Sequence, residues 1–286
     1  MEGDTQTVSL VTGANTGLGY ATATELARQG HRVLVGSRDP GRGAEAVAGI
    51  QAATGSSSVE PLTLDLGDLD AVRRAAAEVR ERCPALHLLV ANAGVAGQRG
   101  VTAQGFELAF GVNHLGHFLL VTELLGLMRA SSPAPDGAPA RLVVVSSGSH
   151  KTARHGIDFD KVRQPTSSVS GMPEYGVSEL ANVLMAQEVA RRVPADELFV
   201  AVLHPGNLIG TDVIRRGPRW VRSAFNRFRP SPEEGARTSV LCATSPEVLS
   251  HRGAYWSVMK IEEPSPVATA ELGAELWRRS EGWVRA

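Results

Sequence analysis

The sequence has little cysteine, little lysine and no long apolar run. Its 286 residues include two cysteines, too few for a disulfide framework, and we expect both to be reduced thiols in a cytoplasmic protein. No apolar stretch reaches the roughly 18 residues of a membrane-spanning helix, and the polar N-terminus lacks the pattern of a secretory signal. The formal net charge of −1 gives no electrostatic basis for binding nucleic acid. No cluster of His, Cys and acidic residues has the spacing of a metal site.

The basic residues are strongly biased in type. Of the 29 lysines and arginines, only Lys151, Lys161 and Lys260 are lysines. We interpret this bias as the base composition of a GC-rich bacterial genome rather than as a functional signal. The hydrophobic share of 43% and the charged share of 21% are typical of a folded globular chain.

Short β-branched runs alternate with helical patterns along most of the chain. The predicted strands cover residues 8–12, 31–36, 59–64, 86–91, 141–145 and 198–203. The predicted helices cover residues 20–29, 44–53, 69–82, 106–129 and 175–192. This alternation predicts one α/β domain over residues 1–286, a doubly wound parallel sheet of the Rossmann type with helices on both faces. Ligands of such a sheet bind at the carboxyl ends of its strands.

A glycine-rich turn follows the first predicted strand and opens the first predicted helix. Glycines there permit a tight turn and a close approach of the backbone to a pyrophosphate, and the helix N-terminus adds free N–H donors. The spacing is G-x-x-x-G-x-G. The candidate cofactor-binding residues of this turn are Gly13, Asn15, Thr16, Gly17, Leu18 and Gly19.

The residues after the second predicted strand bear on the choice of cofactor. A carboxylate at this position would accept hydrogen bonds from the adenosine ribose and repel a 2′-phosphate. The sequence instead has Ser37 and Arg38. Ser37 removes the repulsion and Arg38 can pair with a phosphate. We therefore expect NADP(H) rather than NAD(H), with a solvated surface role for Arg38 as the alternative.

Further motifs follow in order along the chain, and together they resemble the short-chain dehydrogenase/reductase superfamily. The segments around residues 113–118, 147–175 and 204–207 are similar to the subgroup of retinol dehydrogenases and WW-domain-containing oxidoreductases. The resemblance implies cofactor contacts by Asp65, Leu66, Asn92, Ala93, Gly94, Pro205, Gly206, Asn207 and Thr211. It also implies a catalytic set of Asn113, Ser147 and Tyr175, which would act on a small-molecule substrate with a bound nicotinamide.

One position departs from the family pattern. The family places a lysine four residues after its tyrosine, where the ammonium lowers the tyrosine pKa and binds the nicotinamide ribose. This sequence has Glu179 there. A carboxylate one helical turn from Tyr175 should raise the tyrosine pKa instead. We include Glu179 in the catalytic set because it can still accept hydrogen bonds from ribose hydroxyls.

The departure leaves three interpretations open. The first is an NADPH-dependent reductase of a carbonyl or conjugated enone, with an altered proton relay, in a small-molecule or secondary-metabolite pathway. The second is a non-redox enzyme on the same fold, such as a cyclase, dehydratase or isomerase. The third is a cofactor-binding pseudoenzyme.

The region from about residue 207 to residue 230 is rich in arginine and aromatic residues. It lies where this fold carries its substrate lid, so a basic lid for an anionic or carrier-bound substrate is one hypothesis. A solvated amphipathic helix is the alternative, and a helix on a membrane surface is a third. The family often forms homo-oligomers, but nothing in the sequence fixes an oligomeric state.

Overall fold

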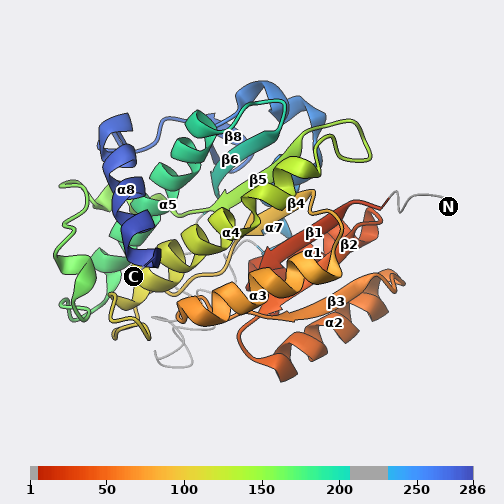
Figure 1. Ribbon diagram of the computed structural model, residues 1–286, viewed down its shortest axis with the longest axis horizontal. Coiled ribbons are helices and arrows are strands. Elements are labelled where there is room, and N and C mark those ends of the chain that lie inside the picture. Colours follow the sequence, from red (N-terminus) through yellow and green to blue (C-terminus); the bar gives the residue numbers. More distant parts are fainter. Residues whose placement is uncertain (1–5, 207–230, 286) are drawn as a thin grey trace.

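The centre of the computed structural model is an eight-stranded sheet, and residues 6–206 and 231–285 are described (Figure 1). The strand order is β3-β2-β1-β4-β5-β6-β7-β8, and every neighbouring pair is parallel except β7 with β8. The strands are β1 (Val8–Thr12), β2 (Arg32–Ser37), β3 (Val59–Thr63), β4 (Leu88–Ala91), β5 (Ala140–Val145), β6 (Leu198–His204), β7 (Tyr255–Ser257) and β8 (Lys260–Glu262). The predicted doubly wound α/β fold is confirmed, with its switch point between β1 and β4.

Helices cover both faces of the sheet and create two separate cores. One core joins buried residues of α3, α4, α5 and α8, such as Leu120 and Leu184, to Leu10 and Leu34 of the sheet. The other joins α1, α2 and α7 to the opposite face, where Val11 lies. The helices are α1 (Gly17–Arg28), α2 (Pro40–Thr54), α3 (Leu69–Arg82), α4 (Gly116–Ala130), α5 (Met172–Arg192), α7 (Pro232–Thr244) and α8 (Ala270–Arg285).

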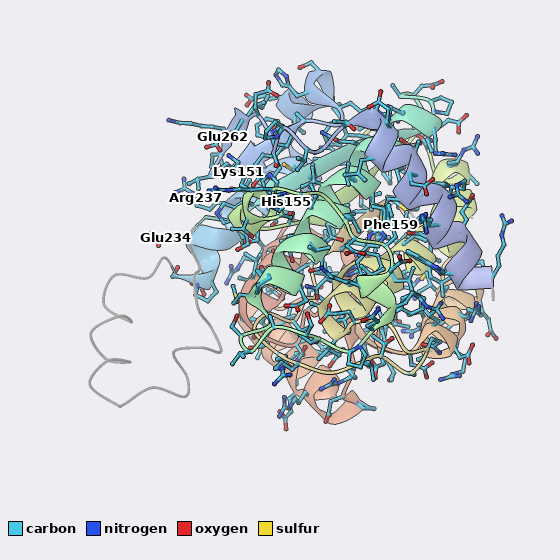
Figure 2. All side chains as sticks on the ribbon, turned by 90° about the vertical axis from the view of Figure 1, so that its left-hand side faces the viewer. Lys151, His155, Phe159, Glu234, Arg237 and Glu262 are labelled. Carbon is cyan, nitrogen blue, oxygen red and sulfur yellow. The ribbon has the colours of Figure 1, made fainter. Side chains whose placement is uncertain are left out.

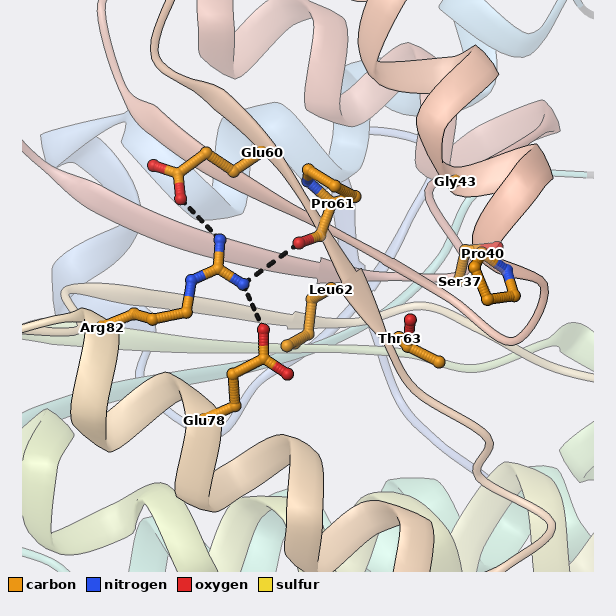
Figure 3. A pocket seen from close by; sticks show the side chains of 9 residues that line it. All are labelled: Ser37, Pro40, Gly43, Glu60, Pro61, Leu62, Thr63, Glu78 and Arg82. Carbon is orange, nitrogen blue, oxygen red and sulfur yellow. Dashed lines mark hydrogen bonds and ion pairs between the residues drawn. The ribbon is translucent and has the colours of Figure 1, made fainter.

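The edge strand β3 is protected against pairing with another strand. Its outward carbonyls accept side-chain donors, Gln51 Nε2 at Val59 O (3.1 Å) and Arg82 Nη1 at Pro61 O (3.2 Å). Pro61 itself has no N–H to offer. Figure 3 shows Arg82 between Glu60 and Glu78. These three residues line a pocket of about 430 Å³ along this edge. Because these outward carbonyls already accept hydrogen bonds and Pro61 has no N–H, this edge is blocked against pairing with another strand.

Several predicted helix boundaries are wrong, and at α2 a capping side chain explains the difference. Helix α2 begins at Pro40, four residues before the predicted start, since the side chain of Asp39 accepts from Arg42 N and proline suits a first turn. Helix α5 begins at Met172 rather than at residue 175. The predicted helix 106–129 has a short π-helix, Phe110–Leu115, before α4.

The chain after residue 203 contains elements that the periodicity did not predict. These are α7, the hairpin of β7 and β8, and α8. Strands of three residues are too short to show a periodic pattern. No helix among the described residues is long and apolar enough to cross a membrane.

Candidate active site

The glycine turn closes against the loop that follows β4. A Cβ on Gly13 would lie 2.9 Å from Ala93 Cα, and a Cβ on Gly19 would lie 2.5 Å from Asn92 Nδ2 and 2.6 Å from Gly13 O. The amide of Asn92 donates to the carbonyl of Thr12 at 2.8 Å. Glycine is therefore required at positions 13 and 19 by close packing of the backbone.

The start of α1 is built to receive an anion. Gly17 has φ +57°, and a Cβ there would meet nothing within 4 Å. Thr16, the residue before the helix, makes no side-chain cap, and the first turn has no acidic residue. The first N–H groups of α1 consequently lack a capping side chain, and the helix dipole favours negative charge at this place. Asn15 and Leu18 are half-buried beside it. These features fit a dinucleotide pyrophosphate.

A network of uncharged groups holds the turn, the β4 loop and the π-helix together. Thr12 Oγ1 accepts from the N–H groups of Asn92 and Ala93, each at 2.9 Å, and lies 2.8 Å from His117 Nε2. His117 Nδ1 lies 2.7 Å from Asn113 O. Burial lowers the pKa of His117 to about 4, so the imidazole is neutral. It donates through Nδ1 and accepts the Thr12 proton at Nε2.

The predicted adenosine contacts lie at the ends of β2 and β3. Ser37 is buried and its hydroxyl donates to Asp39 O at 2.9 Å, whereas Arg38 is exposed. Asp65 accepts from Gly67 N at 2.9 Å, and Leu66 is buried. Ser37 thus shapes the backbone here, and Arg38 is the group that reaches solvent.

The structure brings the predicted catalytic serine and tyrosine together. Ser147 follows β5 and begins a 3₁₀-helix, where its Oγ accepts from Ser149 N at 3.2 Å. Tyr175 lies in the first turns of α5, and its side chain lies close enough to that of Ser147 for the serine to act on the tyrosine pKa and lower it. His150 supports the segment, because its Nδ1 lies 2.8 Å from Ser147 O and its Nε2 accepts from Ser265 N at 3.0 Å.

Asn113 lies in the π-helix, and its amide faces α5. Its Oδ1 accepts from Val95 N at 2.8 Å, while its Nδ2 donates to Val95 O, to Ser178 Oγ at 2.9 Å and, more weakly, towards Glu179 Oε1 at 3.5 Å. A π-helical turn at this point is consistent with a functional site, where such turns are common. Gly94 lies against the side chain of Asn113. The amide is therefore fixed between the β4 loop and α5.

Glu179 is 5% exposed and is surrounded by neutral hydrogen-bond donors. Ser146 Oγ donates to the backbone carbonyl of Glu179 at 3.0 Å. The side chains of Ser146 and Asn182 lower the pKa of the Glu179 carboxyl group, but burial outweighs them and raises it to about 8. Burial, and then the charge of Glu179, raise the pKa of Tyr175 well above its usual value. Within the described residues no lysine or arginine lowers it. The carboxyl group of Glu179 therefore lies beside the tyrosine, and the described part of the chain supplies no cation in its place.

Sequence reasoning missed several supporting residues, namely Thr12, Ser146, Ser178 and Asn182. Each is adjacent in sequence, or one helical turn away, to a predicted site residue, and that proximity is the one signal available for them. Pro205 and Gly206 follow β6 as expected, and Gly206 has φ +104°. Asn207, Thr211 and the expected lid at 207–230 lie outside the described residues.

The comparisons with known proteins agree with this geometry. The short chain dehydrogenase family profile matches residues 7–157. Human retinol dehydrogenase 14 is 42% identical over 96% of this chain and 85% of its own length, and the chicken WW domain-containing oxidoreductase is 37% identical over 97% and 68%. A Mycobacterium paratuberculosis protein structure superimposes with a TM-score of 0.76 at 28% identity, over 99% of this chain and 96% of that one. The Pseudomonas aeruginosa RhlG/NADP complex, at 22% identity and a TM-score of 0.69 over 88% and 94%, shares the fold. On these grounds the chain belongs to the short-chain dehydrogenase family.

Proposed function

We propose that the protein is an NADPH-dependent reductase of a carbonyl or conjugated enone. The observation that carries the proposal is the close approach of the Ser147 and Tyr175 side chains, at the carboxyl ends of the strands where the glycine turn also lies. Family membership supports an oxidoreductase that uses a nicotinamide cofactor. The names of the retinol dehydrogenases point to an apolar substrate.

The chemistry follows from the protonation of Tyr175. Bound NADPH would supply the hydride. Tyr175 donates a proton to the substrate oxygen, and the hydroxyl of Ser147 positions that oxygen. Because the pKa of Tyr175 is raised, the phenol stays protonated throughout the neutral range. The site therefore favours reduction, which consumes this proton, over alcohol oxidation, which needs a tyrosinate base.

We assign NADP(H) rather than NAD(H) because the last residue of β2 is Ser37 rather than an acidic residue and Arg38 is exposed beside it, while the carboxylate of Asp39 is engaged as the cap of α2. Dissociation constants of NADPH and NADH, measured by fluorescence titration, test the assignment. Arg38→Asp should weaken the binding of NADPH much more than the binding of NADH. Equal affinities in the wild type would contradict it.

Glu179 makes the proton relay differ from that of the family. In place of a cation, Glu179 offers a carboxyl group that can accept hydrogen bonds from the ribose hydroxyls. Reprotonation of Tyr175 must then use another route. NADPH oxidation at 340 nm, with carbonyl and enone substrates, tests the proposal in wild type, Glu179→Gln and Glu179→Lys. Turnover in the wild type that falls at least tenfold in Tyr175→Phe supports it. Oxidation that persists in Tyr175→Phe would refute the assigned role.

A non-redox reaction or a cofactor-binding pseudoenzyme is the second candidate, and the buried carboxyl of Glu179 beside Tyr175 favours it. Product formed without NADPH consumption, in both wild type and Glu179→Lys, would identify a cyclase, dehydratase or isomerase. Cofactor binding without turnover, with activity restored by Glu179→Lys, would identify a redox site that this one residue disables.

A further inference from the structure

The tip of the β7–β8 hairpin is strained and exposed. Ser257 pairs with Lys260, so the turn contains two residues, Val258 and Met259. Their φ angles are +45° and +68°, a region that glycine and asparagine normally occupy in such turns. A β-branched residue with positive φ is an outlier. Yet Val258 is 57% and Met259 40% exposed, so packing within the described part of the chain does not account for the choice.

Several contacts place this tip beside the proposed active site. Val258 N donates to His204 O at 3.4 Å, and Val258 Cγ2 lies 3.3 Å from where a Cβ of Gly206 would be. The ring of His204 lies 3.5 Å from the corresponding point on Gly148, the neighbour of Ser147. The hairpin is therefore next to both the segment that follows β6 and the segment that carries the catalytic serine.

Polar contacts fix the hairpin on either side. Lys151 Nζ, in the 3₁₀-helix that Ser147 begins, lies 3.5 Å from Glu262 Oε2 of β8. Figure 2 shows Lys151 and Glu262 next to each other on this face of the molecule. Met259 N donates to Thr238 Oγ1 of α7 at 3.2 Å. The turn is consequently held rigidly rather than left as a mobile loop.

The β7–β8 hairpin carries most of the large apolar side chains that are exposed in the described part of the chain. Val258, Met259 and Ile261 belong to it, and the other two are Val101 and Val169. An apolar surface next to a hydrogen-bonding serine and tyrosine suits a ligand with one polar reacting end and an apolar body.

We propose that the Val258–Met259 turn is the apolar contact of the substrate site and selects substrates with an extended hydrocarbon body. The proposal rests on the proposed function for the reacting end of the substrate, but apolar binding itself does not require turnover. Backbone strain is retained at this turn because the two side chains meet the substrate, and strained residues of this kind cluster at functional sites.

The test replaces the turn without endangering the fold. The double variant Val258→Asn, Met259→Gly has the sequence that a two-residue turn of this geometry prefers, so it should fold at least as well. Lys260→Gln, next to the turn, is the matched control. Two readouts are used: the affinity of the neutral fluorescent probe N-phenyl-1-naphthylamine without cofactor, and KM for butanal and decanal with NADPH.

We expect the double variant to bind the probe about tenfold or more weakly, because burial of valine and methionine side chains supplies binding free energy of this order. KM for decanal should rise by a similar factor, whereas KM for butanal and the NADPH affinity should not change. Weaker probe binding without any NADPH oxidation in the wild type would support this inference while the proposed function failed. Unchanged probe affinity and unchanged decanal KM would overturn it, as would a loss of thermal stability in the double variant, which would show that the turn serves folding.

Discussion

The two halves of the carboxyl edge of the sheet are built by different means. Around β1 and β4, glycines take the left-handed conformations and neutral hydrogen bonds through Thr12 and His117 satisfy the backbone. Beyond β5, a carboxyl group is buried at Glu179, and Val258 and Met259 take left-handed conformations at a cost. The half around β1 and β4 is the relaxed half, because its backbone conformations and hydrogen bonds carry little strain. The half beyond β5 keeps energetically unfavourable features, and such features cluster at functional sites.

The largest loss of stability should come from a substitution of Thr12, in the relaxed half around β1 and β4. Thr12→Val keeps the shape but leaves the N–H groups of Asn92 and Ala93 without their acceptor and removes the donor to His117. Each orphaned group costs about 1–3 kcal/mol. The free energy of unfolding, measured in urea, should fall accordingly, and Thr12→Ser should recover most of it. Equal free energies of unfolding for Thr12→Val and Thr12→Ser would show that the hydroxyl network does not stabilise this half.

The next largest effect should be the dependence of folding stability on pH that the titration of Glu179 causes. The pKa of Glu179 is about 8 in the folded protein, above its ordinary value of 4.5. The folded state therefore binds this proton more tightly than the unfolded state, and the stability associated with it is lost as pH rises from about 4.5 to about 8. Each pH unit in that window is worth about 1.4 kcal/mol.

Glu179→Gln removes this dependence, so the variant should gain about 2–3 kcal/mol over wild type between pH 6 and pH 8. Thermal denaturation at both values measures the gain. Glu123→Gln, in an exposed ion pair with Arg80, is the control and should show no such pH-dependent gain. A constant difference between Glu179→Gln and wild type at both pH values would show that the buried carboxyl does not titrate there.

The same contrast explains what the sequence predicts well. Strands such as β1 and β5 are short, almost entirely buried runs rich in valine, and the glycine turn follows from conformational rules, so both are visible in the sequence. The identity of Glu179 is visible too. Its raised pKa is not visible, because it depends on burial in the folded chain, which outweighs the lowering effect of Ser146 and Asn182. The hairpin strain is equally hidden, since three-residue strands leave no pattern and Val-Met does not indicate a turn.

Gly19→Ala tests the relaxed half at the glycine turn. The added Cβ would lie 2.6 Å from Gly13 O, a backbone atom that cannot move cheaply. We expect a loss of about 1–3 kcal/mol in the free energy of unfolding and much weaker cofactor binding. Gly126→Ala, in α4 with nothing within 4 Å, should instead stabilise by about 0.5–1 kcal/mol. Wild-type cofactor affinity in Gly19→Ala would mean that the glycine turn can move to accommodate the added Cβ without weakening cofactor binding.

The smallest effect should have the opposite sign, because it relieves strain in the second half. Met259→Gly removes a side chain from a residue at φ +68°, where a left-handed conformation costs about 1–2 kcal/mol for residues with a Cβ. Since Met259 is 40% exposed, little burial is lost, and the free energy of unfolding should rise by up to about that amount. Gly30→Ala tests the same rule in reverse at φ +85°, with no neighbour within 4 Å, and should destabilise. If Met259→Gly instead lowered stability, the side chain would be packing for the fold, and the turn would belong with the relaxed half.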